Sequence, residues 1–382
     1  MLETSVLRQA PACLSPATVW AATRAALQTD VMTARRLREL AQAYRVRAID
    51  DAPFTPLPLA DQALEEDEAA LKARMRQLSY EVPAGEWRPI PCLGEPVSQP
   101  RRFIDGSVFS RTVAVFTVEG RRRPAVLACV GALALELDGR RLVRSSGSLR
   151  LETVLCLLSN GIPPEDLQAL SDGLEAVGIR LVASETTELT ADFDELRRRC
   201  WDMAKQRMED EERAVLLQAP EVPAVVDGLL ERRLTTVASQ EMPVIGMVKR
   251  QMRRYLPESH INLLYELRPG ERTPAFLLET EHAFIVSWYV RLSAADTLSP
   301  GYGVVRLTAP REYLERRFPR RAERWAEISA VSHWLHGLRH REQSYARAGI
   351  SLEPIVRVED ELHALLPAVG REAAKLHRAL GV

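Results

Sequence analysis

The apolar residues of this chain follow two different periods. Over residues 1–80 they recur every three to four positions, which is typical of amphipathic helices. Within residues 33–44 the positions that share one helical face are Leu37, Leu40, Ala41 and Tyr44. Beyond residue 100 the apolar residues form short alternating or continuous runs, separated by Glu-Gly-Arg and Asp-Gly-Arg turn signals. We therefore predict a helical N-terminal region (1–80), a proline-rich linker (81–100) and a sheet-containing domain (101–382).

The sheet-containing region predicts an ordered series of elements. Strands are expected at 102–109, 111–119, 124–136, 141–145, 179–183, 223–227, 243–248, 275–280, 283–292 and 302–308. Helices are expected at 149–158, 163–177, 193–218, 310–316, 321–340 and 356–379. Strands first, and then helices alternating with strands, predict an α/β fold: a mixed sheet flanked by helices, with the N-terminal helices as an extension.

Composition and charge narrow the function only slightly. The chain has 382 residues, of which 46% are hydrophobic, so it can bury one large core or two smaller ones. Its formal net charge is −1, which gives no overall attraction to nucleic acid. Arginine instead clusters locally, in residues 121–123, 197–199, 232–233, 253–254 and 316–321. Any binding of a polyanion is therefore expected to be local, and most of these clusters are equally typical of solvated helix faces.

The cysteines and the termini favour a cytoplasmic protein. The five cysteines are scattered without a CxxC pair, and several lie in apolar runs, as buried thiols do in a reducing compartment. We find no leader pattern at the N-terminus and no run of 18 apolar residues, so no membrane association is expected. No Walker A motif is present, so the chain is not expected to hydrolyse ATP.

Three polar residues stand at predicted strand ends. Asp105 lies in residues 103–107 (FIDGS), where the sequence predicts a strand that turns at Gly-Ser into the next one. Asp227 ends the apolar run of the predicted strand at 223–227, and Lys249 follows the run at 244–248. An aspartate before glycine is commonly just a turn residue, and the lysine is also explained by a strand emerging into solvent.

Together the three residues predict a metal-dependent phosphodiester chemistry. Carboxylates bind Mg²⁺ or Mn²⁺, and two such ions roughly 3.5–4 Å apart can hold the attacking and leaving oxygens of an in-line displacement. A nearby lysine can stabilise the developing negative charge or orient the attacking water.

The order of several segments resembles the NurA nuclease family. These segments are residues 103–107 (FIDGS), 225–230 (VVDGLL), 244–249 (VIGMVK), 267–273 (LRPGERT), 286–292 (VSWYVRL) and 303–307 (GVVRL). The resemblance covers residues 100–365, and the N-terminal helices lie outside it. It implies an RNase H-like core and Mn²⁺-dependent (or Mg²⁺-dependent) cleavage of DNA, as a 5′-to-3′ exonuclease with single-strand endonuclease activity. It also implies a homodimer that works with a HerA-type hexameric ATPase on DNA ends in recombinational repair.

The resemblance also assigns site residues. Asp105 and Asp227 match the family's metal-binding aspartates, and Lys249 matches a basic residue after the third segment. The family places a glutamate in the helix before the second aspartate, where this chain has residues 208–212 (MEDEE). We choose Glu209 for this role, with Glu212 on the same helical face as the alternative.

The sequence departs from the family near the C-terminus. A Gln-Asn pair of related sequences is replaced by Ile-Ser within residues 347–355. The last element of the site is therefore left open: Glu359 either completes the metal site or faces solvent. This departure gives weight to an adaptor of the same fold that binds a motor ATPase and DNA ends without cutting. An RNA-directed RNase H-like enzyme is a third reading.

Other candidates have ordinary explanations beside the functional one. Three histidines at 333, 336 and 340 share a helix face, which suits zinc, a DNA-facing surface or simple packing. The Ser107 hydroxyl is expected to bond the turn backbone, since no Gly-x-Ser-x-Gly motif surrounds it. Of Trp288 and Tyr289, one could stack a DNA base, although core packing is favoured. Arg306 is compatible with a phosphate contact or a structural ion pair.

Overall fold

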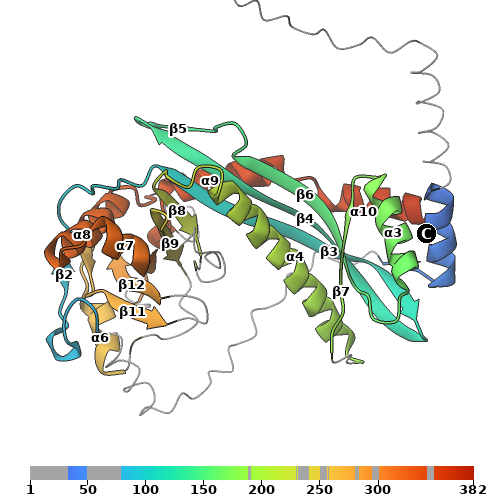
Figure 1. Cartoon of the computed structure of the whole chain (residues 1–382), viewed down its shortest axis with the longest axis horizontal. Coiled ribbons are helices and arrows are strands. Elements are labelled where there is room, and N and C mark those ends of the chain that lie inside the picture. Colours follow the sequence, from blue (N-terminus) through green and yellow to red (C-terminus); the bar gives the residue numbers. More distant parts are fainter. Residues whose placement is uncertain are drawn as a thin grey trace, which may run out of the picture.

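The computed structural model describes residues 33–49, 79–187, 191–228, 230, 241–249, 256, 258–279, 284–294, 301–341 and 348–382. Within these ranges thirteen strands form one mixed sheet, and helices cover both of its faces (Figure 1). The predicted α/β class is confirmed. None of the helices in these ranges is long and apolar enough to cross a membrane.

The sheet has a parallel centre within antiparallel surroundings. The long antiparallel neighbours are β3 (Arg102–Val118), β4 (Arg121–Asp138) and β6 (Leu149–Leu158). Parallel to β3 run β8 (Ala224–Asp227) and then β9 (Val244–Val248). Beyond β9 the order continues with β13 (Val304–Pro310), β12 (Phe284–Arg291), β10 (Glu271–Arg272) and β2 (Ile90–Pro91). The remaining strands are β7 (Arg180–Ser184) beside β6, β1 (Arg47–Ala48) beside β3, β5 (Arg141–Val143) beside β4, and β11 (Phe276–Glu279) beside β12.

Two helices lie against opposite faces of this sheet, and further helices pack at its ends. α4 (Phe193–Leu216) covers one face of β3, β4 and β6, and α9 (Glu353–Leu365) covers the other face of β3 and β4. The end that carries β11 and β12 also carries α6 (Glu258–Glu266), α7 (Arg311–Arg317) and α8 (Arg321–Gly337) (Figure 1). The far end of the long strands carries α3 (Pro164–Glu175), α10 (Val369–Leu380) and the helical residues 33–43.

Most of the predicted elements are present, but the turn predicted at Gly106–Ser107 is wrong. β3 runs through both residues as one strand of 17 residues, and β4 pairs with it along that length, with a register shift only between Thr112 and Ala114. Gly106 pairs with Ala132 in this ladder. The Asp-Gly pair therefore does not reverse the chain. Position 106 is glycine because a side chain from another element occupies the space where a Cβ would lie.

Two other predictions need correction. Residues 149–158 form strand β6 and not a helix, because β4 and β7 pair with its two edges and its second half is buried on both faces. A short, continuous apolar run is compatible with either structure from periodicity alone. The single helix predicted at 356–379 is instead α9 and α10, separated at Pro367, which lacks an amide hydrogen and keeps Leu366 extended (φ −64°, ψ 136°).

The hydrophobic core is divided along the long strands. One cluster packs Phe103 of β3 with Trp288 of β12 and with residues of α9. A second cluster packs Val113 and Phe116 of the same strand with α3, α10 and the helix at residues 33–43. Trp288 is buried in the first cluster, and Tyr289 is buried on the other side of β12, which confirms core packing for both.

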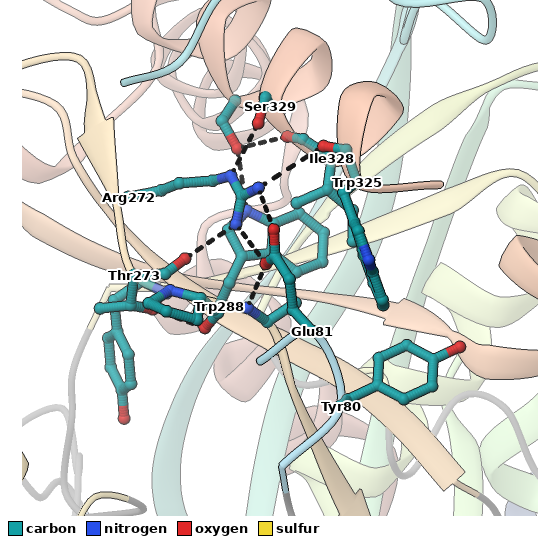
Figure 2. Close-up of polar contacts among 12 residues, drawn as sticks. Tyr80, Glu81, Arg272, Thr273, Trp288, Trp325, Ile328 and Ser329 are labelled. Atoms are coloured by element: carbon teal, nitrogen blue, oxygen red, sulfur yellow. Dashed lines mark hydrogen bonds and ion pairs between the residues drawn. The ribbon is translucent and has the colours of Figure 1, made fainter. Parts of the chain in front are cut away.

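Residues 81–100 pack against the sheet and do not form a free linker. Ser79 bridges to Phe276, and β2 pairs with β10. Glu81 lies under α8, where both of its carboxylate oxygens accept hydrogen bonds from the Arg272 guanidinium at 2.7 and 2.8 Å (Figure 2). Of the predicted N-terminal helices, only the one over residues 33–44 falls in the described ranges, and residues 33–43 are helical.

Candidate metal centre

The strand register brings Asp105, Asp227 and Lys249 to one place. In the parallel ladder Ile104 pairs with Val226, so Asp105 and Asp227 occupy the next position of neighbouring strands. Asp227 in turn pairs with Met247, two residues before Lys249. Asp227 is the last residue of β8, and Lys249 follows Val248, the last residue of β9, so both polar side chains lie at strand ends as predicted.

The two aspartates lie on the face that α9 covers. Phe103, Val225 and Met247 belong to the core cluster that includes α9 residues. Side chains two positions apart on a strand share a face, so Asp105 and Asp227 continue the row begun by Phe103 and Val225. The row thus changes from apolar to acidic within one step along the strands.

A lysine partly neutralises these aspartates. Lys249 Nζ lies 2.8 Å from Asp227 Oδ2, and both side chains are largely buried, at 6% and 18% exposure. Asp105 is 9% exposed, and its Oδ1 accepts a hydrogen bond of 2.9 Å from the Gly106 amide.

The electrostatics of Asp105 are unusual. Burial raises the pKa of its carboxyl well above the ordinary value of 3.8, and the negative charge of Asp227 raises it further. Lys249 lowers this pKa, whereas Glu212 and Glu359 raise it. Three other carboxylates are therefore close enough to act on Asp105, against one ammonium group.

Glu212, the alternative to Glu209, is the glutamate of α4 whose charge raises the pKa of Asp105. It is buried (1% exposed) and lies across Gly106: a Cβ added to Gly106 would lie 2.7 Å from Glu212 Cγ and Oε1. Any side chain at position 106 would displace this carboxylate, which explains the glycine next to Asp105. Glu209 lies one turn earlier, where its Oε1 is 4.0 Å from Lys205 Nζ.

The remaining acids of this run have structural partners. Glu211 is buried and forms ion pairs with Arg150 and Arg207, the latter at 2.5 Å. Asp210 pairs with Arg213 at 3.1 Å. The helical spacing favours Glu212 as the buried acid: the buried stripe on α4 recurs every four residues, at Leu196, Cys200, Ala204 and Met208. The next position of that stripe is 212.

α9 supplies two more polar groups. Glu359 is half-buried and raises the pKa of Asp105, so it lies on the side of the helix that faces the site. His363, one turn further, places Nε2 3.1 Å from Ser107 Oγ. The Ser107 hydroxyl therefore contacts an imidazole from another element, and not the turn backbone that the sequence suggested. Nothing in the local sequence distinguishes His363 before α9 is placed on β3.

The chemistry of these side chains suits a hard divalent cation. Asp105, Asp227, Glu212 and Glu359 provide oxygen ligands of the kind that Mg²⁺ and Mn²⁺ take. Within the described ranges, however, no three Asp, Glu, His or Cys side chains are already gathered as a coordination group. Asp227 is instead paired with Lys249. The carboxylates therefore have the ligand type and the negative charge that suit a divalent cation. Within the described ranges they are not arranged as a complete coordination shell.

Among the other candidates, His340 contacts the start of α9, and Arg306 lies on the strand next to β9. His340 is buried and hydrogen-bonded to Glu353 at the start of α9, at 2.5 Å. The three histidines do not form a metal-binding group in the part of the chain that is described. Arg306 is buried on β13, where it pairs in register with Val248 of β9. No protein-family model matches this chain, and no curated protein matches it.

Proposed function

We propose that this protein is a metal-dependent nuclease that hydrolyses phosphodiester bonds in DNA. The observation that carries this proposal is that Asp227, Glu212 and Glu359 all lie close enough to raise the pKa of the buried Asp105, beside the point where β8 ends next to β3. Such an excess of carboxylates is unfavourable unless a cation compensates it. A DNA phosphate adds further negative charge, which makes a divalent cation the natural compensating group.

In this proposal each side chain has a separate role. Asp105, Asp227 and Glu212 would hold the cation. Glu359 would approach from α9, which covers the face with the two aspartates, and Glu212 from α4, across Gly106. The bound ion would neutralise charge on the phosphate and activate water for attack. Lys249 would contribute positive charge for the phosphate oxygens, since its ammonium group is already buried beside Asp227. Glu209 is a weaker candidate for a metal ligand, because its described ion pair is with Lys205.

The wider assignment follows the sequence resemblance. We propose a NurA-type enzyme with an RNase H-like core, acting as a homodimer on single-stranded DNA and duplex ends. A HerA-type hexameric ATPase would drive it in end resection and recombinational repair, with Mn²⁺ or Mg²⁺ as the cofactor. The buried free thiols of Cys92, Cys129, Cys156 and Cys200 support a cytoplasmic setting.

One observation favours a second candidate, an adaptor of the same fold that binds a motor ATPase and DNA ends without cutting. Asp227 is paired with Lys249, and no finished ligand group is present within the described ranges. In the adaptor the lysine would permanently take the place of the cation. The two candidates differ in one respect that can be measured: only the nuclease requires the Lys249–Asp227 pair to yield to metal.

The test is cleavage by the full chain with Mn²⁺, Mg²⁺ or chelator, on single-stranded DNA, duplex DNA and RNA. We expect metal-dependent cleavage of DNA that Asp105→Ala and Asp227→Ala reduce by roughly 10²–10⁴-fold, since a metal contributes several kcal/mol of charge stabilisation. Glu211→Gln is a matched control, because that buried acid belongs to a structural ion-pair network. Equal activity in wild type and both aspartate variants would reject the site. Cleavage of RNA alone would favour the RNase reading, and inactivity even with the motor ATPase would favour the adaptor.

A further inference from the structure

The strand that carries Asp105 continues past the candidate metal centre. Its next side chains on the same face are a hydroxyl, an aromatic ring and a guanidinium. Alternation on β3 is regular from Phe103 to Arg111, because the register shift comes only after Thr112. Ser107, Phe109 and Arg111 therefore point to the same face as Asp105. At 3.3–3.4 Å per residue, the row from Asp105 to Arg111 is about 20 Å long.

Phe109 is the exposed phenylalanine of β3. It is 40% exposed, whereas Phe103 and Phe116 are at most 1% exposed. A single exposed aromatic residue is common and needs no explanation by itself. Here the ring has a defined environment: the His363 imidazole packs against it, with centroids 5.0 Å apart, and His363 also contacts Ser107. The ring is thus fixed in place beside the metal centre.

The row ends in positive charge. The Arg111 guanidinium lies beside the first turn of α10, where a Cβ added to Gly370 would be 3.7 Å from Nη1. Arg371 follows in the same turn, with a side chain that is 72% exposed. Arg371 Nε lies 3.5 Å from Glu372 Oε1 of the same turn, so its charge is partly balanced there while most of its side chain stays exposed.

One edge of β3 has no described strand beside it along this row. β8 pairs with β3 only up to Ile104, and β1 pairs with it again at Ala114 and Val115. Among the described strands, none pairs with this edge between those two points. α9 and α10 border the other side of the row. An extended chain can therefore lie along Ser107, Phe109 and Arg111 without displacing a described element.

We propose that this row, Ser107, Phe109 and Arg111 with His363, is a binding track for the unpaired nucleotides next to the scissile bond. One base stacks on the Phe109 ring, and Arg111 with Arg371 takes phosphates further along. A single strand fits and a duplex does not, because bases stacked within a duplex have no free face for Phe109. At 3.4 Å per nucleotide the track would span about six nucleotides of B-form geometry, and fewer in a stretched strand. This inference rests on the proposed function for the position of the cut, but not for the binding itself.

Binding and cleavage can be tested separately. With chelator present, anisotropy of a labelled oligothymidylate reports affinity without cutting. We expect Phe109→Ala to weaken binding about 5- to 150-fold, which is the effect of losing one base–aromatic stack, and Phe109→Trp to retain it. Arg111→Gln should lower the slope of log K against log salt by about 0.7, the value for one phosphate contact on a single strand.

Phe284→Ala is the matched control: that phenylalanine is also 40% exposed and lies under a guanidinium, Arg311, but on β12. Its affinity for the oligonucleotide should stay at the wild-type value. Equal losses in Phe109→Ala and Phe284→Ala, or no loss in Phe109→Ala, would overturn the track. So would a wild-type chain that does not bind the single strand.

Photocrosslinking of wild-type protein to an oligonucleotide with 5-iodouracil avoids any folding defect of a variant. We expect the crosslinked peptide to contain Phe109 or His363, and crosslinks found only elsewhere would reject the track. The outcomes also separate the two proposals. If Phe109→Ala weakens binding but the protein does not cleave DNA with metal, the nuclease is rejected and the track is kept. If the protein cleaves DNA but Phe109→Ala binds as well as wild type, the track is rejected and the nuclease is kept.

Discussion

Two of the places where the protein buries charge are built in opposite ways. Beneath α8, Arg272 and Glu81 are almost fully buried and compensate each other through two hydrogen bonds (Figure 2). The Ala275 amide donates a third to Glu81, and the Ser329 hydroxyl accepts one from Arg272 Nε. At the metal centre, Asp105 meets three carboxylates and one lysine. The charges of Arg272 and Glu81 compensate each other within the protein, whereas the negative charges around Asp105 exceed the one positive charge of Lys249.

This difference separates a charge that the protein compensates by itself from one that it does not. A buried ion pair whose hydrogen-bonding groups are met needs nothing further from solvent or ligand. A buried carboxylate among like charges raises the energy of the folded protein until a proton or a cation compensates it. Removing a charge should therefore destabilise the protein at Glu81 and stabilise the metal-free protein at Asp105.

The largest expected effect is at Glu81. Glu81→Ala leaves the Arg272 guanidinium buried without its counter-charge, and we expect a loss of about 3–5 kcal/mol in the free energy of unfolding. Chemical denaturation measures it. Glu39→Ala, which removes an exposed ion pair with Arg35, is the control and should have little effect. Comparable losses in the two variants would show that the Glu81 pair is no more important than a surface contact.

The next effect distinguishes two glutamates on α4. Glu212→Gln should reduce the Mn²⁺-dependent cleavage rate by about 10- to 100-fold, the range reported for groups that support a metal site. Glu209→Gln should change it only a few-fold, because that residue lies one turn away, near Lys205. Initial rates under saturating metal provide the comparison. If Glu209→Gln reduced the cleavage rate more than Glu212→Gln, Glu209 would be the metal ligand, as first chosen from the sequence.

The smallest effect is on stability and depends on pH. A pKa raised in the folded state means that the folded protein binds more protons than the unfolded chain above pH 3.8. Stability without metal therefore falls as pH rises from that value through the folded pKa of Asp105. Asp105→Asn should remove this contribution and raise the unfolding temperature in chelator at neutral pH.

Thermal unfolding of wild type and Asp105→Asn at several pH values, with and without Mn²⁺, measures this contribution. Mn²⁺ should stabilise only the wild type, and more strongly at higher pH, where the carboxylate is deprotonated. An identical pH dependence for the two proteins without metal would contradict the electrostatic account of the site.

The parts of the site that sequence could predict are those set by short local signals. Apolar runs followed by Asp227 and Lys249 are strands that end there, since four or five β-prone residues suffice to define each of them. The turn predicted at Gly106 was wrong. An Asp-Gly pair is typical of a turn, but here the glycine leaves room for a side chain from another element where a Cβ would otherwise lie. That side chain is Glu212, more than 100 positions away in the sequence.

The rest depended on tertiary packing. Residues 149–158 have a leucine-rich pattern that suits a helix, and only their position between β4 and β7 makes them a strand. His363 and Glu359 reach the site because α9 crosses β3, which no local pattern reports. The buried stripe on α4 that reaches position 212 was present in the sequence as a four-residue repeat, and it favours Glu212, the alternative to Glu209.

The length of β3 has a mechanical consequence. Its first residues belong to the core beneath α9, and its last residues belong to the core beside α3 and α10. Neither core can melt without breaking the same β3–β4 ladder, so the two halves are expected to unfold as one cooperative unit. Asp105 and Phe109 lie on the span between the cores. A load applied by a pulled DNA strand would therefore be shared by both.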